Sequence, residues 1–83
     1  MDHKKPEEDL QREIEEAQKQ ITVGAKYEHY KSADKTYTVL GFVVIESEIG
    51  VLYHANYGKN LTFVRPVREW LDPVDGKPRY RKL

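Results

Sequence analysis

The stretch Thr36 to Glu46 constrains the fold more than any other part of the chain. It is rich in β-branched and aromatic residues, a composition typical of a β-strand. Apolar residues occur on both alternating faces, so both faces are expected to be partly buried, and strict alternation places Phe42 on the face opposite Val39. Gly41 lies in mid-strand and predicts a bulge or a sharp bend, as small barrels need at their corners.

The rest of the β portion predicts shorter elements joined by turns. Residues 32–35 carry a turn signal, and Gly58 begins a tight hairpin loop. Pro66 ends a strand because it cannot donate to the ladder. The predicted strands are 27–31, 36–46, 51–57, 61–65 and 79–82, with a single helical turn at 67–71. Four or five short strands in this length argue for a small antiparallel barrel, so we expect a mainly β fold.

The polar N-terminal segment predicts an amphipathic helix. Pro6 suits the first helical position, and the acidic residues Glu7 to Asp9 suit the positive end of the helix dipole. The apolar residues recur at spacings of 4, 3 and 4, which places Leu10, Ile14, Ala17 and Ile21 on one stripe. Gly24 is expected to end the helix in a left-handed cap. We therefore divide the chain into a helix at 1–23 and a barrel domain at 24–83.

The stripe needs a surface to cover it, because a lone helix of about 16 residues is marginal in water. Its own barrel is one candidate. A second copy of the chain is the other, since the spacing corresponds to two heptads and is compatible with a short antiparallel pairing. The sequence thus leaves a monomer and a homodimer through Leu10, Ile14, Ala17 and Ile21 both open.

Charge is unevenly distributed along the chain. Its 14 basic and 14 acidic side chains cancel, which argues against a strongly basic, histone-like binder. Residues 1–20 hold seven acids and four bases, a net of −3, and residues 21–83 hold seven acids and ten bases, a net of +3. An acidic helix is therefore joined to a basic barrel, and it could lie over the basic surface.

Several functional classes find little support. The 83 residues allow one small domain, and the absence of cysteine excludes a disulfide framework and a thiolate metal site. His29 and His54 have no second histidine at ligand spacing, and no glycine-rich phosphate loop occurs. We expect no catalytic activity, no metal and no cofactor. With no apolar stretch of membrane-spanning length and a polar N-terminus, the protein is expected to be cytoplasmic.

A family resemblance appears in the β portion. The blocks that carry it are Tyr27-Glu28-His29-Tyr30-Lys31, Tyr37-Thr38-Val39-Leu40-Gly41, Tyr57-Gly58, Val64-Arg65-Pro66 and Gly76-Lys77-Pro78-Arg79-Tyr80. Over roughly residues 24–81 the chain resembles the bacterial domain-of-unknown-function family 1653. The resemblance implies an SH3-like barrel and assigns no activity.

The chain departs from the pattern of that family in three places. A histidine-containing stretch is expected after the second block, but Val44 to Glu48 has no histidine. Phe63 stands where the family tends to have tryptophan, and Glu69 where it tends to have methionine. If the family's hairpin histidine belongs to a shared site, that site is altered here.

Aromatic and basic residues are the best candidates for a binding surface. Rings can stack on bases or hold prolines and cations, and nearby lysines and arginines can contact phosphates. The predicted partner-binding residues are His29, Tyr30, Lys31, Tyr57, Arg65 and Trp70. For any single tyrosine, a core or half-buried position is the favoured interpretation. Arg65 is also expected to pair with Glu28 or Glu69.

Three functions follow from this pattern. The first is a non-enzymatic module that engages a protein or peptide partner through an aromatic and basic face. The second is a small barrel that binds nucleic acid. The third is an assembly element that oligomerises through the N-terminal helix, with the barrel as a scaffold.

Overall fold

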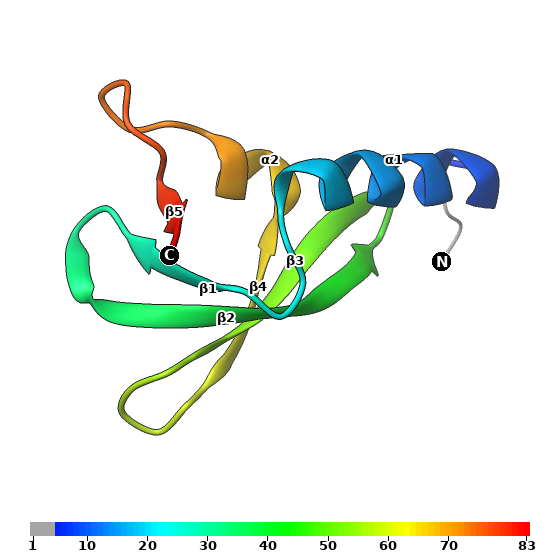
Figure 1. Cartoon of the computed structure of the whole chain (residues 1–83). Coiled ribbons are helices and arrows are strands. Elements are labelled where there is room, and N and C mark those ends of the chain that lie inside the picture. Colours follow the sequence, from blue (N-terminus) through cyan, green and yellow to red (C-terminus); the bar gives the residue numbers. More distant parts are fainter. Residues whose placement is uncertain (1–4) are drawn as a thin grey trace.

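A computed structural model describes residues 5–83 as one bent antiparallel sheet with two helices on the same side (Figure 1). The elements are α1 (Glu7–Gln20), β1 (Lys26–His29), β2 (Ser32–Ile45), β3 (Glu48–Ala55), β4 (Thr62–Pro66), α2 (Val67–Leu71) and β5 (Tyr80–Lys82). The strand order is β4-β3-β2-β1-β5, so the last strand returns beside the first after the short helix. This connectivity is SH3-like, and it confirms the predicted mainly β fold preceded by a helix.

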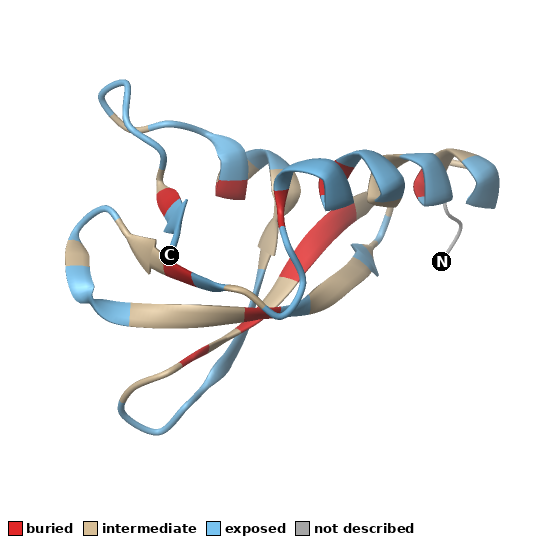
Figure 2. Ribbon diagram, viewed as in Figure 1, coloured by how far each residue is buried: buried red, intermediate tan, exposed pale blue. Residues whose placement is uncertain are grey.

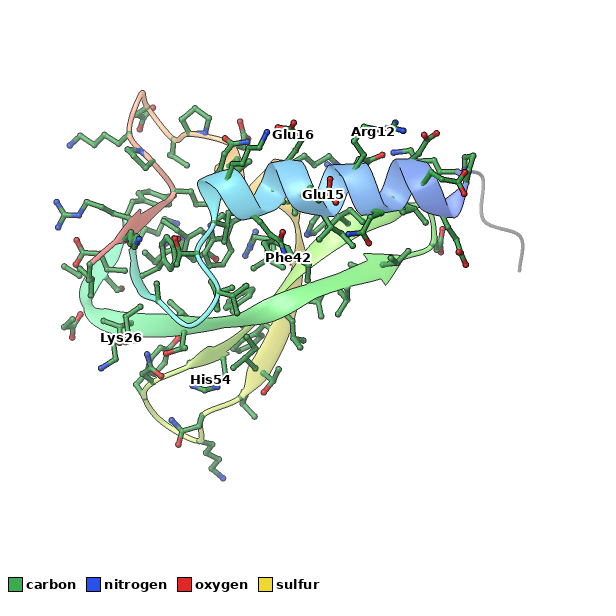
Figure 3. All side chains as sticks on the ribbon, turned by 45° about the vertical axis from the view of Figure 1, so that its right-hand side comes forward. Arg12, Glu15, Glu16, Lys26, Phe42 and His54 are labelled. Atoms are coloured by element: carbon green, nitrogen blue, oxygen red, sulfur yellow. The ribbon has the colours of Figure 1, made fainter. Side chains whose placement is uncertain are left out.

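The bulge predicted at Gly41 is present in β2. Val39 pairs with Tyr53 of β3, but the next partners are Gly41 and Leu52, so Leu40 is an extra residue. One extra residue inverts the alternation beyond it. Phe42 therefore packs against the core on the same side as Val39, and the prediction of opposite faces was wrong. Figure 3 shows Phe42 on the helix side of the sheet and His54 on the other.

The turn before β2 lies earlier than predicted. Residues 32–35 belong to β2, and the chain reverses at Tyr30 and Lys31. His29 pairs with Ser32 and Glu28 pairs with Thr36, so residues 33–35 of β2 lie between two paired positions. Pairing on both sides thus keeps the expected turn residues within the strand.

Helix α1 ends before the predicted glycine cap. Its last residue is Gln20, and Ile21 already has an extended backbone with φ −126°. Ile21 is only 1% exposed, because the extended backbone carries its side chain into the core. Gly24 has φ +87° but lies in the turn that follows, where its N–H donates to the carbonyl oxygen of Val39 at 2.7 Å.

The core lies between the two helices and the concave face of the sheet (Figure 2). Its buried members are Ile21, Tyr27, Val39, Val51, Tyr53, Trp70 and Tyr80. Helix α1 packs against β3 with Leu10 and Ala17 buried and Ile14 half-buried. The barrel of the same chain thus covers the stripe. Pairing of this stripe with a second copy stays a prediction, and it requires α1 to leave β3. Within residues 5–83, no helix is long and apolar enough to cross a membrane.

Candidate functional site

Five strands contribute side chains to one aromatic cavity at the open side of the barrel. The cavity has a volume of about 210 Å³ and is lined by His29, Tyr37, Tyr53, Phe63, Arg65 and Tyr80. We call these six residues the aromatic hollow. Strand register brings them together, because residues paired across antiparallel strands share a face. Tyr53 is opposite Phe63, and His29 is opposite Tyr80.

Tyr53 lies at the centre of the rings. Its ring centroid is 5.6 Å from that of Tyr37, 5.7 Å from Phe63 and 6.0 Å from Tyr80. Behind them, Trp70 stacks on Tyr80 with ring centroids 3.7 Å apart and planes at 6°. Aromatic pairs in these arrangements stabilise each other beyond the area they bury. The hollow therefore has a rigid wall, which Trp70 supports from the core.

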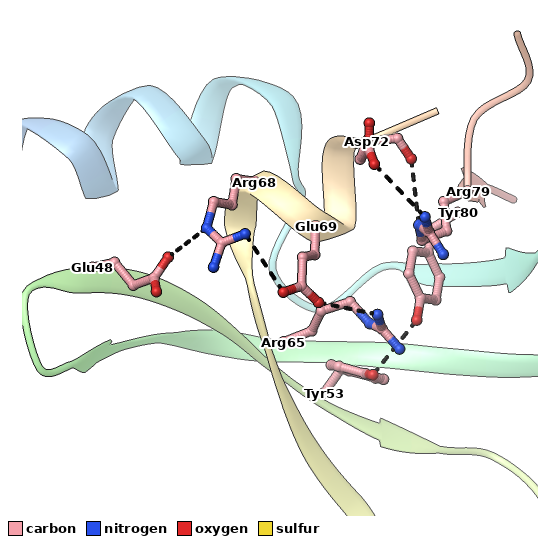
Figure 4. Close-up of polar contacts among 8 residues, drawn as sticks. All are labelled: Glu48, Tyr53, Arg65, Arg68, Glu69, Asp72, Arg79 and Tyr80. Carbon is pink, nitrogen blue, oxygen red and sulfur yellow. Dashed lines mark hydrogen bonds and ion pairs between the residues drawn. The ribbon is translucent and has the colours of Figure 1, made fainter. Parts of the chain in front are cut away.

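Arg65 places a positive charge among the rings. Its guanidinium donates hydrogen bonds to the hydroxyl oxygens of Tyr53 and Tyr80, and its Cζ lies 5.9 Å from the Tyr80 ring centroid (Figure 4). Glu69 of α2 approaches one terminal nitrogen at 3.5 Å. The Nε atom is buried without a hydrogen-bond partner among the described residues. The hydroxyls of Tyr53 and Tyr80, that of Tyr53 first, raise the pKa of Arg65 against the opposing effect of burial and keep it cationic.

The hydroxyls of Tyr37 and Tyr80 are neutral over the ordinary pH range. Burial and a 2.6 Å hydrogen bond to the Tyr57 hydroxyl raise the pKa of Tyr37 to about 12. Burial and the Tyr53 hydroxyl raise the pKa of Tyr80 further. A neutral hydroxyl can both donate and accept. The wall therefore offers polar groups of either kind to a ligand.

His29 is held in its neutral form. Burial lowers its pKa below 6.5, and the positive charges of Arg65, Arg79 and Lys31 lower it further. The Lys31 backbone N–H donates to Nδ1 at 3.2 Å, so the ring proton of the neutral form lies on Nε2. Three positive side chains therefore lie close enough to His29 to disfavour its charged form.

The structure brings two of the six predicted site residues together. His29 and Arg65 line the hollow. Trp70 is 3% exposed and belongs to the core, so it does not present a stacking face. Tyr57 is half-buried and reaches the hollow through the Tyr37 hydroxyl.

Tyr30 and Lys31, the remaining two, lie in the exposed turn after β1. Tyr30 lines a separate cavity of about 370 Å³ on the other side of His29. Of the two predicted partners of Arg65, Glu69 is the one it meets, because Glu28 pairs with Arg81.

Sequence reasoning missed four ring-bearing members of the hollow. They are Tyr37, Tyr53, Phe63 and Tyr80. Alternation in the strands could have placed Tyr37 and Tyr53 on inward faces, and they qualified equally well as core. No local signal connects Phe63 with Tyr80, which are brought together only when β4 and β5 approach from opposite ends of the sheet.

A larger groove of about 580 Å³ runs beside α1 and offers fewer side chains that are free to bind a ligand. It is lined mainly by charged side chains that already have partners, such as Lys5 with Glu13 at 2.7 Å and Arg68 with Glu48 at 3.0 Å. The α1 residues line this groove rather than the hollow. Across residues 5–83, no group of three histidine or acidic side chains is placed to hold a metal ion.

Fold and site together define a small SH3-like domain with an aromatic hollow and an added N-terminal helix. The chain belongs to the family described as Protein of unknown function (DUF1653), whose model matches residues 25–82. The match spans all five strands and α2 and leaves α1 outside. It confirms the resemblance found in the sequence. No curated protein and no solved structure matches the chain significantly.

Proposed function

We propose that the protein is a cytoplasmic, non-enzymatic binding module that holds an extended segment of a protein partner against β4 and the aromatic hollow. The observation that carries the proposal is the position of the hollow beside an exposed strand edge. Phe63 lies on β4 and also lines the hollow. A segment paired with β4 therefore passes directly beside the rings.

The edge of β4 supports a peptide as the ligand. In the described part of the chain, β4 pairs only with β3, so its other edge leaves backbone N–H and C=O groups without a strand partner. Extended peptides bind by adding a strand to such an edge, and pockets for alternate side chains then provide specificity. Side chains along the edge are open, with Phe63 at 39% and Val64 at 46% exposure.

The lining of the hollow favours binding over catalysis. His29 is its only general-base candidate, and no serine, threonine or lysine lies among the six lining residues. The rings instead offer a large, rigid apolar area with hydroxyl groups at its rim. Such surfaces dominate the energetics of protein interfaces.

The nucleic-acid alternative is less well supported by the charges. Two arginines near the hollow already have carboxylate partners, since Arg81 pairs with Glu28 and Arg79 approaches Asp72 at 3.8 Å. A protein surface that binds along a phosphate backbone needs several neighbouring lysine or arginine side chains without acidic partners. We therefore retain nucleic-acid binding as an outcome of the test.

The test is selection of peptides from a random 12-residue phage library on the immobilised protein. We expect enriched peptides. In a synthetic copy, N-methylation of one alternate set of backbone amides should abolish binding and N-methylation of the other set should not, because only every second amide faces β4. A uniform response to N-methylation would exclude strand addition. Failure to enrich any peptide, with salt-sensitive binding of a fluorescent 20-nucleotide single-stranded DNA at low salt, would favour the nucleic-acid alternative.

A further inference from the structure

The guanidinium of Arg65 has unused capacity for hydrogen bonds. It carries five N–H donors in a planar fork that matches a carboxylate. Its partners are two hydroxyl oxygens and one carboxylate at 3.5 Å, and Nε has none in the described structure. The side chain is 32% exposed, so it is open to solvent on one side. A guanidinium that has unused N–H donors and lies beside a cavity is suited to bind an external anion.

The charges around the hollow disfavour the usual ligand of an aromatic cage. Rings arranged around a cavity commonly hold a cation such as methylated lysine. Here a cation would face Arg65 inside the hollow, where Glu69 approaches only one terminal nitrogen of the guanidinium, at 3.5 Å, and Lys31 lies close to His29. Glu28 cannot offset this charge, because Arg81 holds it. Complementarity therefore favours an acidic group.

We infer that the hollow receives the carboxylate of an aspartate or glutamate side chain, carried by the extended peptide and held by Arg65. This inference rests on the proposed function. A strand added to β4 points every second side chain to the face that carries Phe63 and Arg65. The cavity of about 210 Å³ has room for such a side chain. The surrounding rings exclude water from the ion pair and so strengthen it.

A side-chain carboxylate fits the edge better than the C-terminal carboxylate of a chain. Arg65 pairs with Val51, one pair before the Pro66 end of the β3–β4 ladder, which continues to Thr62 on the other side. The side chains of an added strand project to the faces of the sheet, so one of them can point into the hollow. A terminal carboxylate instead continues the backbone along the edge of β4, in the plane of the sheet and not over the hollow.

The experiment uses peptides selected on the wild-type protein from a library fused at its C-terminus, so that no terminal carboxylate is present. We expect a shared aspartate or glutamate at one position of the enriched peptides. In an amidated synthetic copy, Glu→Gln or Asp→Asn at that position should weaken binding to the wild type at least tenfold. The same change should alter binding to Arg65→Met by less than twofold, because the two groups act as a pair.

Arg68→Met is the matched control. It removes the same charge from an exposed side chain that pairs with Glu48 and does not line the hollow, so it should bind the peptide like the wild type. Arg65→Lys keeps the charge without the fork and should bind with intermediate affinity. If Arg65→Met fails to fold, as judged by circular dichroism, the test is the binding of the acidic peptide and its amide variant to the wild type and to Arg65→Lys.

The outcomes separate the inference from the proposed function. Enriched peptides without a shared acid, or equal binding to wild type and Arg65→Met, would overturn the carboxylate inference and leave peptide binding intact. If no peptide is enriched on the wild type relative to Phe63→Ser, the proposed function itself is wrong.

Discussion

Alanine at Gly50 should destabilise the fold, whereas alanine at Gly41 should not. Gly50 is buried in β3, and an added Cβ would lie 2.6 Å from Cδ1 of Ile45 and 2.9 Å from Cγ1 of Val64. The end of Ile45 can rotate away, but Val64 is β-branched and stiff about χ1. An added Cβ at Gly41 meets nothing within 4 Å. Neither glycine has a positive φ, so alanine causes no backbone strain at either site.

The expected magnitudes follow from these contacts. Over-packing of this kind costs about 1–3 kcal/mol. Replacing glycine by alanine restricts the unfolded chain and returns about 0.4–1 kcal/mol. Gly50→Ala should therefore lower the free energy of unfolding by about 1 kcal/mol, which lowers Tm by about 4–8 °C in a domain of this size. Gly41→Ala keeps only the favourable contribution and should raise Tm by about 2–8 °C.

Thermal unfolding followed by circular dichroism measures both variants. The fluorescence of Trp70, the only tryptophan, provides a second probe, because it is 3% exposed in the folded state. If Gly50→Ala melts at or above the wild-type temperature, the contacts with Ile45 and Val64 relax freely and the packing argument is wrong. If the Tm of Gly41→Ala falls as far as that of Gly50→Ala, the loss of stability comes from the backbone of β-strand glycines and not from crowding.

Two further predictions concern the hollow and the helix. Because the folded pKa of His29 is lowered below 6.5, the unfolded chain binds more protons, and stability should fall as pH drops through 6.5. His29→Gln should flatten the dependence of Tm on pH between 7.5 and 5.0, and equal slopes of the two proteins would contradict the partial burial of His29. Ala17→Arg should lower Tm by at least about 5 °C because Ala17 is buried on the face of α1 that packs against β3, whereas Gln18→Arg on the exposed face should not. Peptide binding that changes in Gln18→Arg would show that α1 reaches the hollow.

Local chemistry was enough to predict several elements. The helical turn at Val67–Leu71 was predicted with its observed bounds, because Pro66 ends the ladder and begins the turn. The bulge at Gly41 was predicted because a glycine interrupts a β-branched run. The position of Phe42 was not, since the extra residue in the bulge inverts every face beyond it. A periodic pattern cannot show that inversion without the pairing to β3.

The hollow escaped prediction for a related reason. Each of its rings also fits a core position, and only the register decides which rings meet at a cavity. Tyr53 faces Phe63 through one pairing, and His29 faces Tyr80 through another. Arg65 was selected from its place in a family block, whereas Trp70 was selected for its chemistry alone and proved to be buried. Surface aromatics and core aromatics look alike in a sequence when their long-range partners are unknown.

The neutral net charge conceals where charge is available for a ligand. The acidic side chains of α1 are largely engaged on the helix itself, as Asp9 is with Arg12 at 3.0 Å and Glu16 with Lys19 at 3.2 Å. The helix packs on β3 and lines a different groove from the hollow. The helix keeps an excess of negative charge, with six acids against two bases over residues 7–20, but this charge lies beside the groove and not beside the hollow. The position of α1 therefore leaves Arg65 accessible, so an acidic partner meets the hollow without first displacing α1.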